Sequence, residues 1–376
     1  MARRFKIAFC IVVLAGLLAV GLSTTVKMLH DGHLKSFLSG PEKAEAALSD
    51  NLLGDKFLLI PYRVTNALLG TRYFVGSELY IEDNGQVVKQ TYTEPSSSKA
   101  DNVAELAAFC EERGIDFIYI IAPGKPEYDS ELLDIGIPCH RNETADILAR
   151  GLEERGINLY DLRERFHDGY DDWFYKTDHH WNTEAGLEAT RLIVERLNAD
   201  FGCGLDASRL DDELFERTVY PHCFVGENGL ATLGPFGTIE DFTVIKPKYD
   251  VDLHYVSPDI GVDRTGGFDI MLEDFRLEDR SFLGARTRYY YYLDGNHNKI
   301  ELTNNDVEKG DILLVKDSFS TVVTPFLAMA SHHVTAWDMR EDPHIFEYIE
   351  EHPEIETVVV LYNTGSTGTT NLNDFQ

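Results

Sequence analysis

Two short segments of this sequence carry residue types that could do chemistry together. One is residues 175–182, where Asp178 and His180 stand two positions apart. At that spacing the carboxylate can bond the imidazole, fix its tautomer and stabilise the ring when it takes a proton. The other contains Ser318, just after the apolar run 312–315. A serine, a histidine and an aspartate are the residue types that acyl transfer through a serine ester requires.

Each segment also has simpler interpretations. An Asp-Ser pair after a strand, such as Asp317 and Ser318 here, often only caps the following helix. Adjacent histidines often serve turns or packing. Asp178, His179 and His180 are also good metal-ligand types. The sequence has no further Cys/His cluster at zinc-ligand spacing, which favours a triad that uses neither metal nor cofactor.

The elements around these segments alternate between buried strands and amphipathic helices. Apolar runs indicate strands at 117–121, 312–315 and 358–361, and the segments 157–162 and 334–337 are predicted to be strands of the same sheet. Helical periodicity indicates helices at 102–113, 144–155, 183–197, 322–330 and 343–351. Alternation of this kind predicts an α/β fold with a parallel sheet and helices on both of its faces.

The α/β pattern is interrupted between residues 203 and 308. Short β-like segments such as 242–245 and 288–293 alternate there with Gly, Asp and Asn turns, which predicts a mostly β insertion. The second segment holds four successive tyrosines at 289–292. A strand would point half of them inward, so we favour a β-sheet core for them over a carbohydrate-binding platform.

The charge balance limits the possible partners. The 376 residues include 34 Lys and Arg against 64 Asp and Glu, a formal net charge of −30. That balance argues against a nucleic-acid partner, which would need a basic face. A hydrophobic content of 43% indicates a globular chain rather than a disordered one. The length allows two domains, or one domain with a large insertion.

Residues 1–26 are predicted to anchor the chain in the cell membrane. Arg3, Arg4 and Lys6 precede an apolar stretch at 7–22, close to the roughly 20 residues that span a bilayer. The basic residues would hold the N-terminus in the cytoplasm and place the rest outside it, in a single-pass arrangement. Cleavage as a signal peptide is the alternative, which would give a secreted protein.

The remaining chain is predicted to have two parts. Residues 27–98 are a polar stalk or N-terminal region, and residues 99–365 are the α/β domain with its insertion at about 203–308. The four cysteines after the anchor could form two disulfides or remain thiols. They are Cys110, Cys139, Cys203 and Cys223.

The two chemical segments together resemble the DHHW protein family, which is similar to the SGNH-hydrolase-like proteins of alginate O-acetylation. The motifs are Thr177–Asn182 with Ala185–Gly186, followed much later by Leu314–Phe319. Supporting segments occur in the expected order at 122–125, 160–162, 292–296 and 337–340. The resemblance covers roughly residues 70–365.

The resemblance implies a three-layer, SGNH-hydrolase-like (flavodoxin-like) α/β fold with a permuted order, in which the Asp/His motif precedes the serine. It makes Ser318 the nucleophile, His180 the general base and Asp178 its orienting partner. A clear GxND block is lacking, so the oxyanion donor stays open. Candidates for oxyanion or substrate contacts are Asn363, Asn296, Arg340 and Trp181. Arg340 could equally form a surface salt bridge, and we favour Trp181 as a wedge in its loop over a sugar-stacking ring.

The function implied is an extracytoplasmic serine acyltransferase that O-acetylates a cell-surface or exported polysaccharide. The resemblance also implies a polytopic membrane O-acyltransferase as the acetyl supplier. Water in place of the sugar hydroxyl would give a carbohydrate acetylesterase with the same triad. A non-catalytic polysaccharide-binding or assembly protein is the alternative from another class.

The sequence makes one geometric prediction. Ligand sites of open α/β sheets lie at the carboxyl ends of the strands. We therefore expect Asp178, His180 and Ser318 to meet at that edge of one sheet, and a structure with the two segments on opposite edges would contradict it.

Overall fold

The computed structural model describes residues 55–74, 76–90, 98–125, 130–234, 237–273, 277, 288–368 and 373–375. The chain divides into two compact units, Met1–Thr71 and Arg72–Gln376. Helix α4 (Asp55–Leu69) is described in the first unit. The predicted anchor at 1–26 lies outside the described residues. No helix in the described part of the chain is long and apolar enough to cross a membrane.

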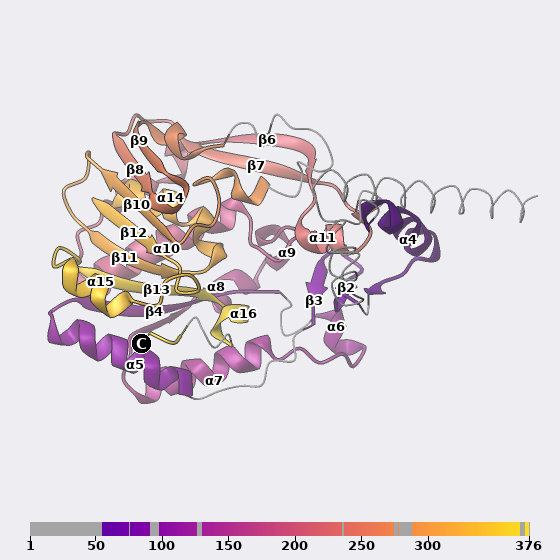
Figure 1. The fold of residues 1–376 in the computed structure, drawn as a ribbon, viewed down its shortest axis with the longest axis horizontal. Coiled ribbons are helices and arrows are strands. Elements are labelled where there is room, and N and C mark those ends of the chain that lie inside the picture. The colour runs from indigo at the N-terminus through magenta and orange to yellow at the C-terminus, as the bar shows by residue number, and fades with distance from the viewer. Residues whose placement is uncertain are drawn as a thin grey trace, which may run out of the picture. The chain divides into compact units, whose positions relative to one another are not determined.

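An eight-stranded sheet forms the centre of the second unit (Figure 1). Its strand order is β5-β4-β13-β11-β12-β10-β8-β9. The strands are β4 (Asp116–Ala122), β5 (Leu159–Asp161), β8 (Leu253–Ser257), β9 (Val262–Gly266), β10 (Lys299–Asn304), β11 (Asp311–Lys316), β12 (His333–Trp337) and β13 (Thr357–Asn363).

The five strands predicted to form a parallel sheet do so, but the sheet as a whole is mixed because it has three further strands. Strands β5, β4, β13, β11 and β12 pair in parallel, whereas β10, β8 and β9 continue the sheet in antiparallel pairs. These three strands come from the predicted insertion. The link between β8 and β9 is only the short turn Pro258–Gly261, and a link that short can join only antiparallel neighbours.

The parallel strands are apolar along their whole length because each faces two cores. In β4, Ile118 and Ile120 pack into one core together with Ile193 of α10. Tyr119 and Ile121 point the other way, into a core that includes Leu148 of α7. The predicted three-layer α/β architecture is therefore present.

Helices cover both faces of the sheet (Figure 1). The core on one face includes residues from α5, α7 and α15, and the core on the other includes residues from α10 and α14. The helices of this unit are α5 (Ser98–Glu112), α6 (Glu131–Asp134), α7 (Arg141–Glu154), α8 (Arg163–His167), α9 (Tyr170–Trp173), α10 (Thr183–Phe201), α11 (Glu227–Ala231), α14 (Thr324–Ala330), α15 (Ile345–Glu351) and α16 (Thr364–Thr367).

Smaller β structures complete the unit. A three-stranded antiparallel sheet is formed by β1 (Tyr73–Phe74), β2 (Leu79–Ile81) and β3 (Val87–Lys89). The rest of the predicted insertion includes a two-stranded ribbon of β6 (Phe215–Phe224) and β7 (Glu240–Pro247). The insertion therefore builds the ribbon and also widens the central sheet.

The β-like segment at 288–293 is not a strand. Arg288–Tyr291 form the 3-10 turn η6, and Leu293 and Asp294 then adopt positive φ angles of 60° and 58°. Tyr289, Tyr291 and Tyr292 are nevertheless buried in the main core. Aromatic enrichment correctly indicated burial but not the backbone shape, since tyrosine packs equally well from a turn.

The four cysteines of the second unit are free thiols. Cys110 of α5 is buried in the core, and burial raises the pKa of its thiol to about 12. Of the two alternatives left by the sequence, the structure has the unpaired one.

Replacement of Gly186 should destabilise the protein although alanine favours helices. A Cβ at this position of α10 would collide with the carbonyl oxygen of Val322. Overpacking of that kind costs about 1–3 kcal/mol, which exceeds the gain of about 1 kcal/mol in helix propensity. We expect Gly186→Ala to lower the free energy of unfolding measured with urea. The exposed Glu195→Ala in the same helix should change it by less than about 0.5 kcal/mol.

Candidate active site

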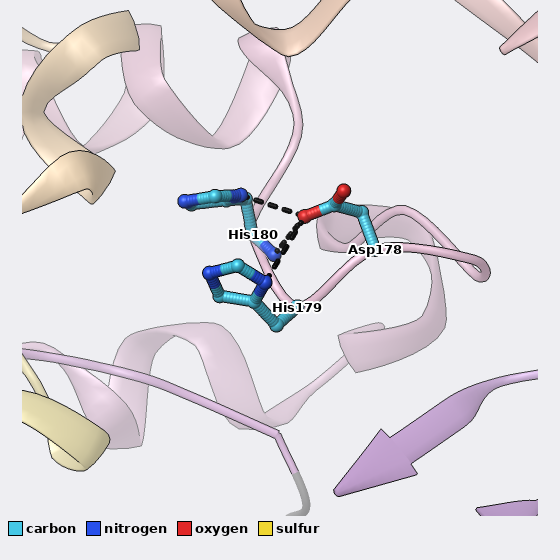
Figure 2. Close-up of side chains that lie close together, drawn as sticks. All are labelled: Asp178, His179 and His180. Carbon is cyan, nitrogen blue, oxygen red and sulfur yellow. Dashed lines mark hydrogen bonds and ion pairs between the residues drawn. The ribbon is translucent and has the colours of Figure 1, made fainter. Parts of the chain in front are cut away.

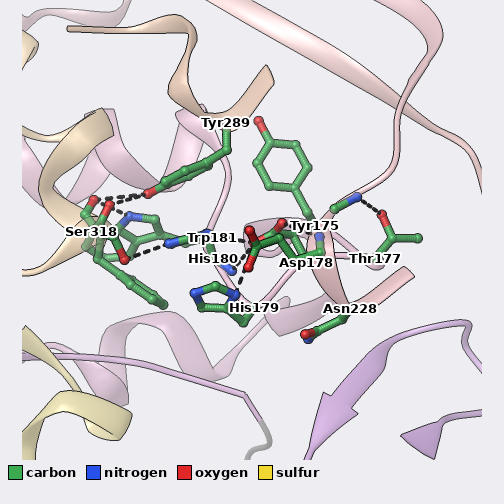
Figure 3. A network of polar contacts seen from close by, with 12 residues as sticks. Tyr175, Thr177, Asp178, His179, His180, Trp181, Asn228, Tyr289 and Ser318 are labelled. Atoms are coloured by element: carbon green, nitrogen blue, oxygen red, sulfur yellow. Dashed lines mark hydrogen bonds and ion pairs between the residues drawn. The ribbon is translucent and has the colours of Figure 1, made fainter. Parts of the chain in front are cut away.

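The structure brings Asp178, His180 and Ser318 together in one hydrogen-bonded chain (Figure 3). The Nε2 of His180 lies 2.7 Å from the Oγ of Ser318, and its Nδ1 lies 2.6 Å from the Oδ1 of Asp178. Asp178 and His180 are buried, whereas Ser318 is partly accessible. Solvent or a substrate can therefore reach the serine end of the chain, and the aspartate end is closed.

Ser318 is held at the carboxyl end of β11 by the residue before it. Asp317 caps the 3-10 turn η7 (Ser318–Val322), accepting a hydrogen bond of 2.8 Å from the N–H of Phe319. Its other oxygen accepts bonds from the backbone N–H and the side-chain amide of Asn363, at 2.9 and 2.6 Å. Because Asn363 ends the neighbouring strand β13, the serine is fixed to two adjacent strands at once.

His180 is placed by the loop that leads into α10. Asn182 is the N-cap of that helix and accepts a bond of 3.0 Å from the N–H of Ala185. Trp181 lies between His180 and Asn182 in the chain, and its fully buried indole donates a bond of 2.9 Å to the carbonyl of Phe319. Trp181 therefore joins the histidine loop to the serine turn, which is the wedge role favoured from the sequence.

Asp178 is ionised and its orientation is fixed. Burial by itself would raise its pKa, but the contacts of the carboxylate with His180 and His179 outweigh that effect and hold the pKa well below its ordinary value. Its Oδ2 accepts a bond of 3.0 Å from the N–H of Glu227. Gly226 packs so closely on Asp178 that a Cβ there would overlap the carboxylate. A negative charge therefore faces the Nδ1–H of the imidazole.

The backbone around Asp178 is held from two sides by opposite charges. The ammonium of the buried Lys125 donates to the carbonyls of Tyr175 and Lys176 and to that of Asp178, the last at 2.8 Å. The carboxylate of Glu240 accepts from the N–H groups of Lys176 and Thr177, at 2.5 and 2.7 Å. Burial lowers the pKa of Lys125 to about 8, although Glu240 and Asp178 oppose the shift.

Several of these positions could not be chosen from the sequence. Lys125 belongs to a supporting segment of the resemblance, and Tyr289 to the tyrosine run, but nothing assigned either to the site. Glu240 and Gly226 gave no signal, because each contacts a distant loop: Glu240 binds its backbone and Gly226 packs on the Asp178 side chain.

The candidate oxyanion and substrate residues are engaged in other contacts. Both amide hydrogens of Asn363 are used, on Asp317 and on Ser366. Asn296 donates to Asp338 at 2.9 Å and accepts from Lys316 at 2.7 Å.

Arg340 forms a two-pronged ion pair with Asp338. That pair is the salt bridge foreseen as the alternative to substrate contact. The structure therefore places Asn363, Asn296 and Arg340 in the framework around the serine strand rather than in the chain of hydrogen bonds.

Metal binding by Asp178, His179 and His180 would cost a hydrogen bond of the triad. These three residues offer ligand atoms within 4.8 Å of one another (Figure 2). Both ring nitrogens of His180 are already hydrogen-bonded, to Asp178 and to Ser318. A cation would have to break one of these bonds, so the residue types fit a metal but the arrangement fits a triad.

Fold and site together define an α/β protein with a serine, a histidine and an aspartate in line at the carboxyl edge of its parallel strands. Residues 79–216 match the family described as SGNH hydrolase-like domain, acetyltransferase AlgX. No curated protein sequence matches the chain.

Solved structures share the fold over most of the chain. PatB1 of Bacillus cereus is 19% identical with a TM-score of 0.63, covering 79% of this chain and 99% of that one. Its structure with a sulfonyl adduct gives a TM-score of 0.64 at 18% identity, over 79% and 97% of the two chains. A DHHW family protein of Eubacterium siraeum gives 0.58 at 17% identity, over 78% and 96%. The resemblance drawn from the sequence motifs is confirmed.

Removal of the Lys125 ammonium should destabilise the histidine loop. Lys125→Met leaves the buried carbonyls of Tyr175 and Asp178 without this donor, and each unsatisfied group costs about 1–3 kcal/mol. We expect urea unfolding to show a loss of at least about 2 kcal/mol. Lys176→Met is the matched control, since this lysine makes one exposed bond to Asn84. Equal stability of the two variants would contradict the role of Lys125.

The triad and metal interpretations predict opposite effects of chelation. A triad needs no ion, whereas a metal site loses activity when the ion is removed and regains it when the ion returns. We expect acetyl-ester turnover to persist after dialysis against EDTA. Loss of turnover with EDTA followed by recovery with zinc would show that Asp178, His179 and His180 act as ligands.

Proposed function

We propose that the chain is an extracytoplasmic serine acyltransferase that O-acetylates a cell-surface or exported polysaccharide. The observation that carries this proposal is the hydrogen-bonded chain from Asp178 through His180 to Ser318. The family description of residues 79–216 as an acetyltransferase domain supports the type of reaction. The sulfonyl adduct described for PatB1, which shares the fold, supports a test with a sulfonyl reagent.

In the first half of the proposed reaction an acetyl group moves to the serine. The Nε2 of His180 takes the proton from the Oγ of Ser318 as this oxygen attacks the acetyl carbonyl of the donor. The N–H of Ser318 lies at the start of η7, where a helical turn leaves its first N–H groups without internal partners. It can therefore donate to the developing oxyanion. The donor's leaving group departs with the proton from the imidazolium.

In the second half the acetyl group moves to the sugar. The Nε2 of His180 takes the proton of a sugar hydroxyl, whose oxygen attacks the carbonyl of the Ser318 ester. As the tetrahedral intermediate collapses, the Oγ of Ser318 leaves and recovers the proton from the imidazolium. Asp178 stays ionised through both halves, because its low pKa keeps it from accepting the proton. It stabilises each imidazolium and holds the ring in one tautomer.

The surroundings of the reaction are part of the same proposal. A polytopic membrane O-acyltransferase would supply the acetyl group, and the segment 1–26 would anchor the chain in the membrane with its α/β domain outside. Hydrolysis by water would use the same three residues and make the protein a carbohydrate acetylesterase. The choice of acceptor decides between the two reactions.

Replacement of the nucleophile should reduce the rate of acetyl-ester turnover more than replacement of the orienting carboxylate. Ser318→Ala removes the covalent route, so turnover of a chromogenic acetyl ester should be abolished. Asp178→Asn should leave a small residual rate, after a loss on the order of 10⁴-fold by analogy with serine proteases. The rates are measured with the purified protein, with and without oligosaccharide acceptors. Acetylated oligosaccharide among the products identifies a transferase, and free acetate alone identifies an esterase.

Covalent labelling gives the control for these rates. A sulfonyl fluoride should modify the native protein at Ser318, as peptide mass spectrometry would reveal, and should not modify Ser318→Ala. Unchanged turnover by Ser318→Ala would reject the mechanism. An unreactive but correctly folded native protein would favour a non-catalytic polysaccharide-binding role.

A further inference from the structure

The imidazole of His180 lies between two rings that the reaction scheme leaves unused. The ring of Tyr289 stacks on one side, with centroids 3.8 Å apart and planes 11° apart (Figure 3). The ring of His179 lies 3.8 Å from it at a tilt of 37°. Figure 3 shows Tyr289 and His179 on opposite sides of His180. Only the edge of the imidazole therefore remains for Asp178 and Ser318.

Tyr289 is held in this stack by its own hydroxyl group. The hydroxyl donates to the carbonyl of Ser318 at 3.0 Å and approaches that of Phe319 at 3.4 Å. The side chain is 2% exposed, and Tyr175 and Tyr290 pack against it edge to face. The hydroxyl contacts and the packing of the two neighbouring tyrosines therefore hold the ring against His180.

We propose that Tyr289 is a further catalytic residue, whose ring face stabilises the imidazolium of His180 each time that ring holds the proton of Ser318 or of the acceptor. This role rests on the proposed function, since only a reaction that protonates His180 would use it. The neutral imidazole gains little from the stack, whereas the cation is attracted by the negative face of the aromatic ring. The contribution therefore grows as the reaction approaches its charged state, as a catalytic contribution must.

The other groups around His180 are consistent with this role. Asp178 supplies the counter-charge at Nδ1, and the rings of Phe319 and Tyr290 add uncharged neighbours at 5.3 and 6.5 Å. His179 would oppose a second cation if it were protonated. Its pKa is lowered, first by burial and then by the charges of His180, Arg141 and Lys125, against the pull of Asp178.

His179 therefore stays neutral on its side of the ring. Tyr289 stays a neutral phenol, since burial raises its pKa well above the ordinary value. A phenolate so close to Asp178 would repel that carboxylate. The stack thus offers His180 a polarizable face that carries no charge of its own.

The test measures the proton affinity of His180 directly. Histidine labelled with ¹³C in the ring gives its pKa by NMR, with His180→Gln used to assign the signal. A cation–π contact in a desolvated site contributes up to roughly a tenfold change in the acid constant. We therefore expect Tyr289→Leu to lower the pKa of His180 by about one unit. Tyr289→Phe keeps the ring and should keep the pKa within a few tenths of the native value.

A matched control separates the stack from general packing. Tyr290 is the next tyrosine in the chain and meets His180 edge-on at 6.5 Å and 73°, so Tyr290→Leu should leave the pKa of His180 unchanged. Circular dichroism selects folded variants, and Tyr289→Met serves where the leucine variant does not fold. An unchanged pKa in folded Tyr289→Leu or Tyr289→Met would overturn the proposal. An equal decrease in the pKa of His180 in Tyr289→Phe would also overturn the proposal, because it would assign the effect to the hydroxyl group.

Kinetics then connect the pKa to the reaction. In Tyr289→Leu the value of kcat for acetyl-ester turnover should fall about tenfold with KM nearly unchanged. The acid limb of the profile of kcat/KM against pH should move to lower pH, because a less stabilised imidazolium loses its proton earlier. A shifted pKa with an unchanged kcat would reject the catalytic role. A native protein that shows the stack by NMR but no turnover would instead reject the proposed function, so the two failures are distinguishable.

Discussion

The site depends on how one buried loop satisfies its backbone. Residues 175–178 run through the interior without regular secondary structure, so their N–H and C=O groups need partners there. Lys125 supplies a cation to the carbonyls and Glu240 an anion to the N–H groups. Each charge is costly to bury alone. Together they bind both the C=O and the N–H groups of the peptide units that link residues 175–177. The Asp178 carboxylate keeps its orientation because the backbone that carries it is held by these bonds.

The insertion completes the site as well as enlarging the sheet. Glu240 begins β7, Glu227 begins α11, and Tyr289 follows in η6. These residues contact, respectively, the histidine loop, the Asp178 carboxylate and the His180 ring. The strands of the α/β core therefore position the serine and the histidine, and the insertion determines how they are oriented and surrounded.

The sequence predicts the two chemical segments and the parallel half of the fold well, and the supporting contacts poorly. Ser318 and His180 could be found because their types, spacing and neighbouring elements are local signals. The partners of Lys125 are backbone carbonyls about 50 residues away along the chain, which no side-chain pattern encodes. The run at 289–292 indicated burial but not a 3-10 turn. The insertion was predicted to be mostly β, but its antiparallel pairing with the central sheet was not, because that pairing joins segments far apart in the chain.

The spacing of the triad along the chain has a consequence for biosynthesis. The bond between His180 and Ser318 joins residues 138 positions apart. At roughly 5–20 residues per second of synthesis, the serine is added about 7–28 s after the histidine. Throughout that interval the growing chain holds an imidazole and a carboxylate without the hydroxyl that they would activate. The nucleophile can therefore acquire its base only after the whole of residues 180–318 has been made and folded, so reactivity toward acyl donors cannot arise from the first-made half of the α/β domain alone.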